Sequence, residues 1–295
     1  MSTLSTYAIA KLIVAIAAGC LAVTVALTPL VMRFARRIGA VDRGGYRKVF
    51  RGEIPLLGGL GIAAPFIFLS IAVCIAGHLI VRNWQWLWLH HRGLFDPLFS
   101  LAGTRNDSMT LAIGGIAIVA LGWIDDVKNL RARWKLLGQI AVAMFVVISG
   151  YAITSVSVPW LGVWQFGRVA GGFLAMIWVV GLINAFNLVD GIDGLATGIA
   201  LIGAAALIVL GIMQKSVYVT CAGAALTGSL LAFLPFNFPP ARVFLGDTGS
   251  MFLGYSLAMM SLLGAQKSEA AVIILAPMFA LGLPIFETLV SILRR

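Results

Sequence analysis

Apolar residues along the chain gather into long blocks that are separated by short polar segments. A block of about twenty apolar residues is long enough to cross a lipid bilayer as a helix. The blocks predict helices near residues 7–32, 57–81, 108–124, 136–153, 169–187, 195–213, 217–236, 250–265 and 270–292. The pattern therefore predicts an all-α fold, a polytopic transmembrane helical bundle with about nine spans.

The polar segments between these blocks are too short to form a domain of their own. Each is shorter than about thirty residues, which is too little to bury a hydrophobic core. The chain is 61% hydrophobic and only 11% charged, whereas a soluble domain carries roughly 25% charged residues. We therefore expect residues 1–295 to form a single integral-membrane domain, whose first apolar run is a retained helix and not a cleaved signal peptide.

Charged residues are concentrated on one side of the predicted helices. If the first polar segment faces the cytoplasm, 14 of the 21 basic residues and eight of the eleven acidic residues fall on that side. Cytoplasmic connections of membrane proteins are enriched in lysine and arginine, so we expect the N-terminus outside and the C-terminus in the cytoplasm. Acidic residues follow no such rule, and their presence on the same face indicates a functional site.

Four polar segments on this face carry the candidate chemistry. They read "DRGGYRKVFRGEIPLLGG", "GWIDDVKNLRARWK", "NAFNLVDGIDGLATG" and "PPARVFLGDTGSMFLGY". The neighbouring carboxylates of Asp125 and Asp126 repel one another, so keeping both ionised requires a cation or a basic partner. Oxygen ligands without a nearby histidine favour Mg²⁺, with Mn²⁺ as the alternative. Arginine and lysine beside such a metal suit phosphate oxygens, which is the composition of a phosphoryl-transfer site.

The third segment is the most specific of the four. Its polar residues Asn184, Asn187, Asp190 and Asp193 follow one another at intervals of three, and this spacing places the first three along a slanted stripe on a helix. Each of the other segments also has a structural interpretation. The basic segment could serve only the positive-inside rule and contact with anionic lipid. The Asp-Asp pair could be a solvated helix cap or a partner of local lysines, and "GDTGS" could be a turn with a helix cap.

Together the segments resemble the polyprenyl-phosphate N-acetylhexosamine-1-phosphate transferases, glycosyl transferase family 4. "RKVFRGEIPLLGG" resembles the first-loop element of that family, "GWIDD" its Asp-Asp motif, "NAFNLVDGIDGLATG" its Asn-x-x-Asn-x-x-Asp-Gly-x-Asp-Gly motif and "FLGDTGS" its Phe-x-Gly-Asp-x-Gly-Ser motif. The resemblance implies a Mg²⁺-dependent enzyme of the bacterial cytoplasmic (inner) membrane, with its active site on the cytoplasmic face. It would transfer a sugar-1-phosphate from a UDP-sugar to undecaprenyl or another polyprenyl phosphate and release UMP.

The resemblance also implies roles for individual residues. Asp247 would bind the metal, while Asp125 and Asp126 would be catalytic, handling the acceptor phosphate with one of them as base or orienter. Phe244 would stack on uracil. The residues expected to bind substrate are Arg47, Lys48, Arg51, Asn184, Asn187, Asp190, Asp193 and Phe244. The expected partners are the two substrates and membrane lipid, without nucleic acid, and a homodimer is left open.

Two features of the sequence bear on the branch of the family. The muramoyl-pentapeptide branch typically has Thr-Pro-Thr before the glycine pair, where this chain has Ile54-Pro55-Leu56, and "PIFETLVSILRR" resembles the N-acetylglucosamine branch. N-acetylglucosamine is therefore the favoured sugar, and phospho-N-acetylmuramoyl-pentapeptide transfer is the alternative. The chain stops where the family continues into a histidine-bearing loop and one or two further helices, so we expect a truncated member or a fragment.

Two other classes of protein remain as alternatives at this point. A transporter for an anionic substrate would carry charged residues near the middle of its spans and a detectable internal repeat. Here the acidic residues cluster at one face of the membrane and no repeat is evident. A non-catalytic membrane scaffold is the third alternative.

Overall fold

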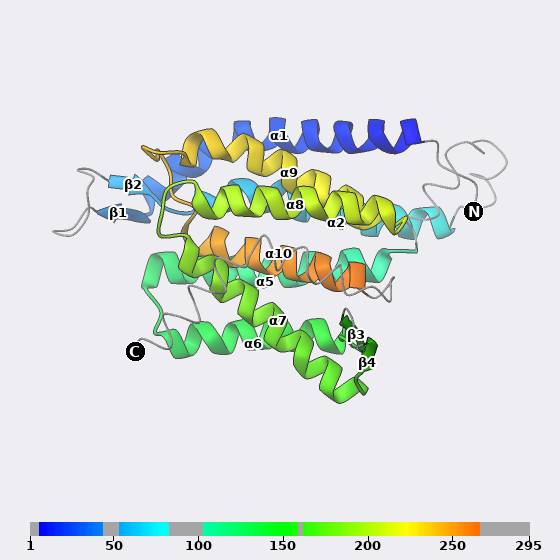
Figure 1. The fold of residues 1–295 in the computed structure, drawn as a ribbon. Coiled ribbons are helices and arrows are strands. Elements are labelled where there is room, and N and C mark those ends of the chain that lie inside the picture. Colours follow the sequence, from blue (N-terminus) through cyan, green and yellow to red (C-terminus); the bar gives the residue numbers. More distant parts are fainter. Residues whose placement is uncertain (1–5, 44–52, 83–102, 159–161, 266–295) are drawn as a thin grey trace.

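The structure, a computed structural model, describes residues 6–43, 53–82, 103–158 and 162–265 (Figure 1). Within them, eight long helices run side by side. They are α1 (Thr6–Arg37), α2 (Gly59–Arg82), α5 (Arg105–Lys128), α6 (Ala132–Ile148), α7 (Arg168–Val189), α8 (Leu195–Met213), α9 (Val217–Asn237) and α10 (Gly246–Ala265). Seven of them, all except the 17-residue α6, are long and apolar enough to cross a membrane. The polytopic helical bundle is thus confirmed for these residues, and the predicted helix at 270–292 lies outside them.

Helix α10 forms the centre of the bundle and is buried along nearly its whole length. It packs against α5, α7 and α2, while α9 is covered by α1 and α8. Small residues allow the closest of these approaches. A Cβ atom on Gly59 would lie 2.1 Å from the Cα of Gly249, so α2 and α10 meet backbone to backbone. This contact places the start of α2 against the start of α10.

Several helix boundaries differ from those predicted from the apolar blocks. Helix α5 continues to Lys128, so that Asp125 and Asp126 lie in its last turn and not in the following loop. It ends at Asn129, whose left-handed backbone (φ 50°) is a conformation that asparagine tolerates better than most residues. Helix α6 occupies 132–148 where 136–153 was predicted, and α10 begins at Gly246 where 250 was predicted. Backbone hydrogen bonding carries α5 and the start of α10 beyond their apolar stretches, whereas α6 ends before its apolar stretch does, so hydropathy alone misplaces helix ends.

Two small antiparallel hairpins were not predicted. Strand β1 (Val41–Arg43) pairs with β2 (Glu53–Pro55), and β3 (Ser155–Val158) pairs with β4 (Gly162–Gln165). The two hairpins lie at opposite ends of the bundle (Figure 1). Strands of three or four residues carry too few alternating positions to be recognised from sequence.

The helices alternate in direction, so the described residues of the four polar segments lie at the same end of the bundle (Figure 1). This is the end that the distribution of basic residues predicts to be cytoplasmic. The expected orientation can be tested with single cysteines and a membrane-impermeant maleimide applied to intact cells. We expect Lys215→Cys, between α8 and α9, to react, and Arg131→Cys, between α5 and α6, to react only after permeabilisation. The reverse result would invert the predicted topology, and the unsubstituted protein gives the background from its native cysteines.

Candidate functional site

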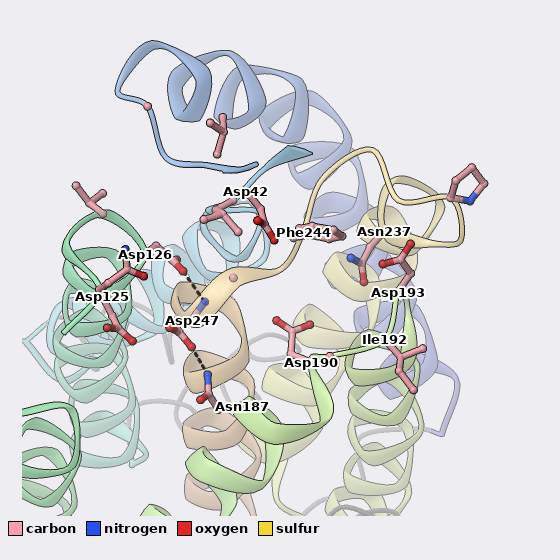
Figure 2. A pocket seen from close by; sticks show the side chains of 18 residues that line it. Asp42, Asp125, Asp126, Asn187, Asp190, Ile192, Asp193, Asn237, Phe244 and Asp247 are labelled. Carbon is pink, nitrogen blue, oxygen red and sulfur yellow. Dashed lines mark hydrogen bonds between the residues drawn. The ribbon is translucent and has the colours of Figure 1, made fainter. Parts of the chain in front are cut away.

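A pocket of about 1030 Å³ lies at the end of the bundle where the four polar segments meet (Figure 2). Six of its eighteen lining residues carry carboxylates. They come from β1, from the last turn of α5, from the α7–α8 connection and from the first turn of α10, and they are Asp42, Asp125, Asp126, Asp190, Asp193 and Asp247. Asn187, Asn237 and Phe244 complete the functional lining. Segments that are up to 200 residues apart in the sequence therefore build one electronegative cavity.

Lys135 joins two of these carboxylates. Its ammonium nitrogen lies 2.5 Å from Asp125 Oδ2 and 3.0 Å from Asp247 Oδ2. The side chain of Asp125 is only 5% exposed and that of Lys135 18%, so the ion pair is largely removed from water. Asp125 Oδ1 also accepts a hydrogen bond of 2.7 Å from the backbone N–H of Leu130. A positive charge is thus already stabilised between the two aspartates.

Asp126 faces a different neighbour from Asp125. Its Oδ1 accepts a hydrogen bond from the backbone N–H of Asp247 at 2.8 Å, and its Oδ2 accepts from the backbone N–H of Thr248 at 2.9 Å. The hydroxyl of Thr248 donates a third hydrogen bond to Oδ2 at 2.5 Å. Adjacent residues point about 100° apart on a helix, which explains why one carboxylate meets α6 and the other meets α10.

The two asparagines near the end of α7 also point to different partners. The amide of Asn187 donates to Asp247 Oδ1 and, at 3.0 Å, to the hydroxyl of Ser250. Asn184 lies one turn earlier and donates to Gln139 Oε1 of α6 at 2.6 Å. Asn187 lines the pocket, whereas Asn184 is not among the lining residues. Of the stripe expected from the spacing, Asn184 and Asn187 lie on α7 and Asp190 caps its end, and only Asn187 and Asp190 reach the cavity.

Asp190 and Asp193 come from the short turn between α7 and α8. Burial and then the charges of Asp247, Asp126 and Asp193 hold the pKa of Asp190 well above its usual range. Asp193 Oδ2 accepts a hydrogen bond of 3.0 Å from the backbone N–H of Ala241. This hydrogen bond joins the turn to the connection between α9 and α10. The carboxylates of the turn lie close to other acidic side chains, so a bound cation would stabilise their charged forms.

Asn237, at the end of α9, also forms hydrogen bonds that join the α7–α8 connection to the α9–α10 connection. Its side-chain oxygen accepts from the backbone N–H of Gly194 at 3.2 Å and from the hydroxyl of Thr197 at 2.7 Å. Its amide donates to the carbonyl of Val243 at 3.1 Å. Asn237 is 2% exposed and lies beside Asp193 at one side of the pocket (Figure 2).

Phe244 is held through its backbone by the segment between β2 and α2. Its N–H donates to the carbonyl of Pro55 at 2.9 Å, and its carbonyl accepts from the N–H of Gly58 at 3.1 Å. Gly59 N–H then donates to the carbonyl of Leu245 at 2.9 Å. This short ladder joins the first and last polar segments. The predicted phosphate-binding residues Arg47, Lys48 and Arg51 lie outside the described residues, between the strands β1 and β2.

The donor set fits a magnesium ion. Asp125 and Asp247 supply hard oxygen atoms around a position already occupied by the cationic end of Lys135. Within the described parts of the chain, no three histidine, cysteine, aspartate or glutamate side chains form a ready-made metal site. Mg²⁺ is usually bound through one or two carboxylates, waters and substrate phosphates, and not in an all-protein cage. The pocket therefore suits a metal that binds together with a phosphorylated substrate.

Four site residues were not selected from the sequence: Asp42, Lys135, Asn237 and Thr248. Lys135 belongs to the quoted segment "GWIDDVKNLRARWK". It lies on α6, whereas Asp125 lies on α5, so the sequence alone does not show that the two side chains meet. Thr248 lies inside "GDTGS", where only its side-chain bond to Asp126 distinguishes it from a local cap. Asn237 lies before the fourth segment and carries no sequence signal of its own.

Comparison with known proteins gives a consistent result. Residues 108–265 match the family model of Glycosyl transferase family 4. The chain is 38% identical over 270 residues to a probable undecaprenyl-phosphate N-acetylglucosaminyl 1-phosphate transferase of Bacillus subtilis, covering 91% of this chain and 68% of the relative. It is 30% identical over 298 residues to a decaprenyl-phosphate N-acetylglucosaminephosphotransferase of Mycobacterium tuberculosis, covering 92% and 68%. A phospho-N-acetylmuramoyl-pentapeptide-transferase of Lactiplantibacillus plantarum is 32% identical over 252 residues, covering 81% and 71%.

Proposed function

This chain belongs to glycosyl transferase family 4, and on that premise we propose that it transfers N-acetylglucosamine-1-phosphate from UDP-N-acetylglucosamine to undecaprenyl or a related polyprenyl phosphate, releasing UMP. The observation that carries the proposal is the meeting of all four polar segments in one carboxylate-lined pocket at one end of a membrane bundle. We place this pocket at the cytoplasmic face of the bacterial inner membrane, where a UDP-sugar arrives from water and the polyprenyl acceptor from the bilayer.

The reaction needs positioning more than it needs a strong base. An oxygen of the acceptor phosphate attacks the phosphorus that carries the sugar, and the bond from this phosphorus to UMP breaks, so UMP leaves with the electron pair. A phosphate monoester has a second pKa near 6, so the acceptor is mostly a dianionic nucleophile at neutral pH. Alignment of the reactants and neutralisation of their charge therefore supply most of the acceleration.

The described residues divide these tasks between them. We assign Asp247 and Asp125 to the metal, which when bound offsets negative charge on the diphosphate and on the leaving UMP. Lys135 lies within reach of the same oxygen atoms and would attract the acceptor phosphate. Asn187 orients Asp247, while Asp190 and Asp193 face the donor nucleotide. Arg47, Lys48 and Arg51 remain predicted phosphate-binding residues.

A second donor is supported by the relative from Lactiplantibacillus plantarum, whose name specifies phospho-N-acetylmuramoyl-pentapeptide transfer. The two reactions share the pocket chemistry and differ in the sugar and its peptide. We favour N-acetylglucosamine because the relative with 38% identity carries that sugar in its name and because Ile54-Pro55-Leu56 replaces the Thr-Pro-Thr typical of the other branch.

A direct assay distinguishes these alternatives. The protein, purified into nanodiscs with undecaprenyl phosphate and Mg²⁺, is supplied with either UDP-N-acetylglucosamine or UDP-N-acetylmuramoyl-pentapeptide, and release of UMP is measured. We expect UMP with the first donor and little with the second. UMP release with only the muramoyl donor would establish the other branch, and no release with either donor from folded protein would contradict the proposed reaction.

Phe244 is expected to stack on the uracil of the donor, because it lies on the pocket wall three residues before Asp247. Phe244→Ala should weaken donor binding by about 1–3 kcal/mol, the scale of base–aromatic stacking. The loss should appear mainly as a higher donor KM, since stacking far from the phosphorus stabilises the ground and transition states alike.

The measurement is steady-state kinetics in which the donor and the lipid are varied separately. Phe173→Ala is a suitable control, because Phe173 is 62% exposed near the other end of the bundle. A selective rise in the acceptor KM of Phe244→Ala would refute the stacking role and move Phe244 to the lipid side of the pocket.

A further inference from the structure

Asp126 provides the N-terminal cap of another helix. The first N–H groups of any α-helix lack partners within the helix, and in α10 two of them, those of Asp247 and Thr248, donate to the Asp126 carboxylate of α5. The Thr248 hydroxyl adds a third donor. A carboxylate at this position also interacts favourably with the positive end of the helix dipole.

The packing around this cap leaves no room for a side chain at either of two glycines. Gly246, which precedes Asp247, has a left-handed backbone (φ 72°), and a Cβ atom there would lie 2.8 Å from Asp126 Oδ2. A Cβ atom on Gly122, one turn before Asp126 on α5, would lie 2.5 Å from the Cα of Thr248. The backbones of α5 and α10 therefore touch directly behind the carboxylate, and the cap fixes how α10 begins.

Asp247 is held from three sides as a result. Asp126 fixes its backbone, Lys135 approaches one carboxylate oxygen and Asn187 approaches the other. Both oxygens of Asp126 already accept hydrogen bonds from α10, so protonating this carboxylate would weaken the cap. Asp125 has no contact of this kind with the backbone of α10 and instead shares Lys135 with Asp247.

We propose that Asp126 is a positioning residue whose capping of α10 sets the orientation of Asp247 for metal binding, and that of the Asp-Asp pair only Asp125 joins Asp247 in holding the metal. This inference rests on the proposed role of Asp247 as metal ligand. The two adjacent aspartates of the motif would therefore have different roles.

Thr248 offers a test that leaves the carboxylates unchanged. Thr248 is fully buried and does not line the pocket, so Thr248→Val removes one donor to Asp126 without touching a substrate. We expect the affinity for Mn²⁺, measured by electron paramagnetic resonance in the presence of UDP, to fall about tenfold, the usual scale for losing a hydrogen bond to a charged group. Hydrogen exchange at residues 246–249, followed by mass spectrometry, should accelerate. Thr248→Ser should restore both values.

Thr220→Val is the matched control. Thr220 is also a buried threonine, but it lies at the far end of α9 and donates to the carbonyl of Ser216 in its own helix. It should change neither Mn²⁺ affinity nor exchange at residues 246–249. A Thr248→Val protein with normal Mn²⁺ affinity and normal exchange would overturn the positioning role.

Two further variants separate failure of this inference from failure of the proposed metal site. If Asp247→Asn binds Mn²⁺ normally, the metal assignment is wrong, while the exchange measurement still shows whether Asp126 caps α10. Asp126→Asn retains one acceptor oxygen and should keep measurable turnover with a raised requirement for Mg²⁺. A loss of about 1000-fold or more at unchanged Mn²⁺ affinity would instead make Asp126 a chemical base and overturn the inference.

Discussion

Asp247→Asn is expected to lower the turnover of the transferase at least ~100-fold while the bundle remains folded. The substitution nearly conserves the shape of the side chain and removes the charge that would face both the metal and Lys135. Loss of one major electrostatic stabiliser of a transition state typically costs a factor of about 100–1000 in rate. The measurement is UMP release with saturating donor and acceptor over a range of Mg²⁺ concentrations.

Asp107→Asn serves as the control for this substitution. Asp107 is also a carboxylate near a helix end, but it lies at the opposite end of the bundle, where its Oδ1 accepts a hydrogen bond of 2.6 Å from the hydroxyl of Tyr151. Asparagine can still accept that bond, so turnover should be close to normal. Near-normal turnover in Asp247→Asn would contradict the assignment of Asp247 as a metal ligand.

Lys135→Met is expected to produce the largest loss of stability. It leaves the buried carboxylate of Asp125 without its cation and facing the like charge of Asp247. Removing one partner of a buried ion pair typically costs about 3–5 kcal/mol, which should appear as a clear fall in the thermal midpoint in detergent. Added Mg²⁺ should raise that midpoint more in the variant than in the unsubstituted protein, because the two carboxylates then share the metal alone.

Two further variants show whether the loss of stability in Lys135→Met comes from the unpaired carboxylate. Lys128→Met removes a lysine that is exposed at the end of α5 and should change the midpoint little. The double variant Asp125→Asn/Lys135→Met should recover part of the lost stability, because it removes the uncompensated charge as well. An unchanged midpoint in Lys135→Met would show that solvent already screens the pair.

The sequence was sufficient to predict the bundle and the meeting of its motifs. Long apolar blocks predict membrane helices because the bilayer sets their length, and alternation of direction then brings every second connection to the same face. The end of α5 and the start of α10 were harder to predict, because polar residues such as those at 125–128 continue a helix without adding to its hydropathy.

The individual tasks within the motifs were not predictable. Asp125 and Asp126 look equivalent in sequence, and only the places of α6 and α10 around α5 give them different partners. Asn184 and Asn187 were both expected to bind substrate. Asn184 instead donates a hydrogen bond to Gln139, and no pattern in the sequence shows that the helix carrying Gln139 packs against it. The alternative interpretation of the Asp-Asp pair as a helix cap was accurate for Asp126, although the helix capped is not its own. The roles of these residues toward substrate remain predictions.

The absence of a side chain at Gly122 has a consequence for how the motif "GWIDD" should be understood. Its glycine and its last aspartate lie one helical turn apart on the same face of α5, and both meet the first turn of α10. The glycine sets the crossing distance of the two helices, and the aspartate uses that distance to reach the α10 amides. In a redesigned transferase, Gly122 and Asp126 would therefore have to be changed together. A bulkier residue at Gly122 would push α5 and α10 apart, and the Asp126 carboxylate would then be too far from the α10 amides to accept their hydrogen bonds.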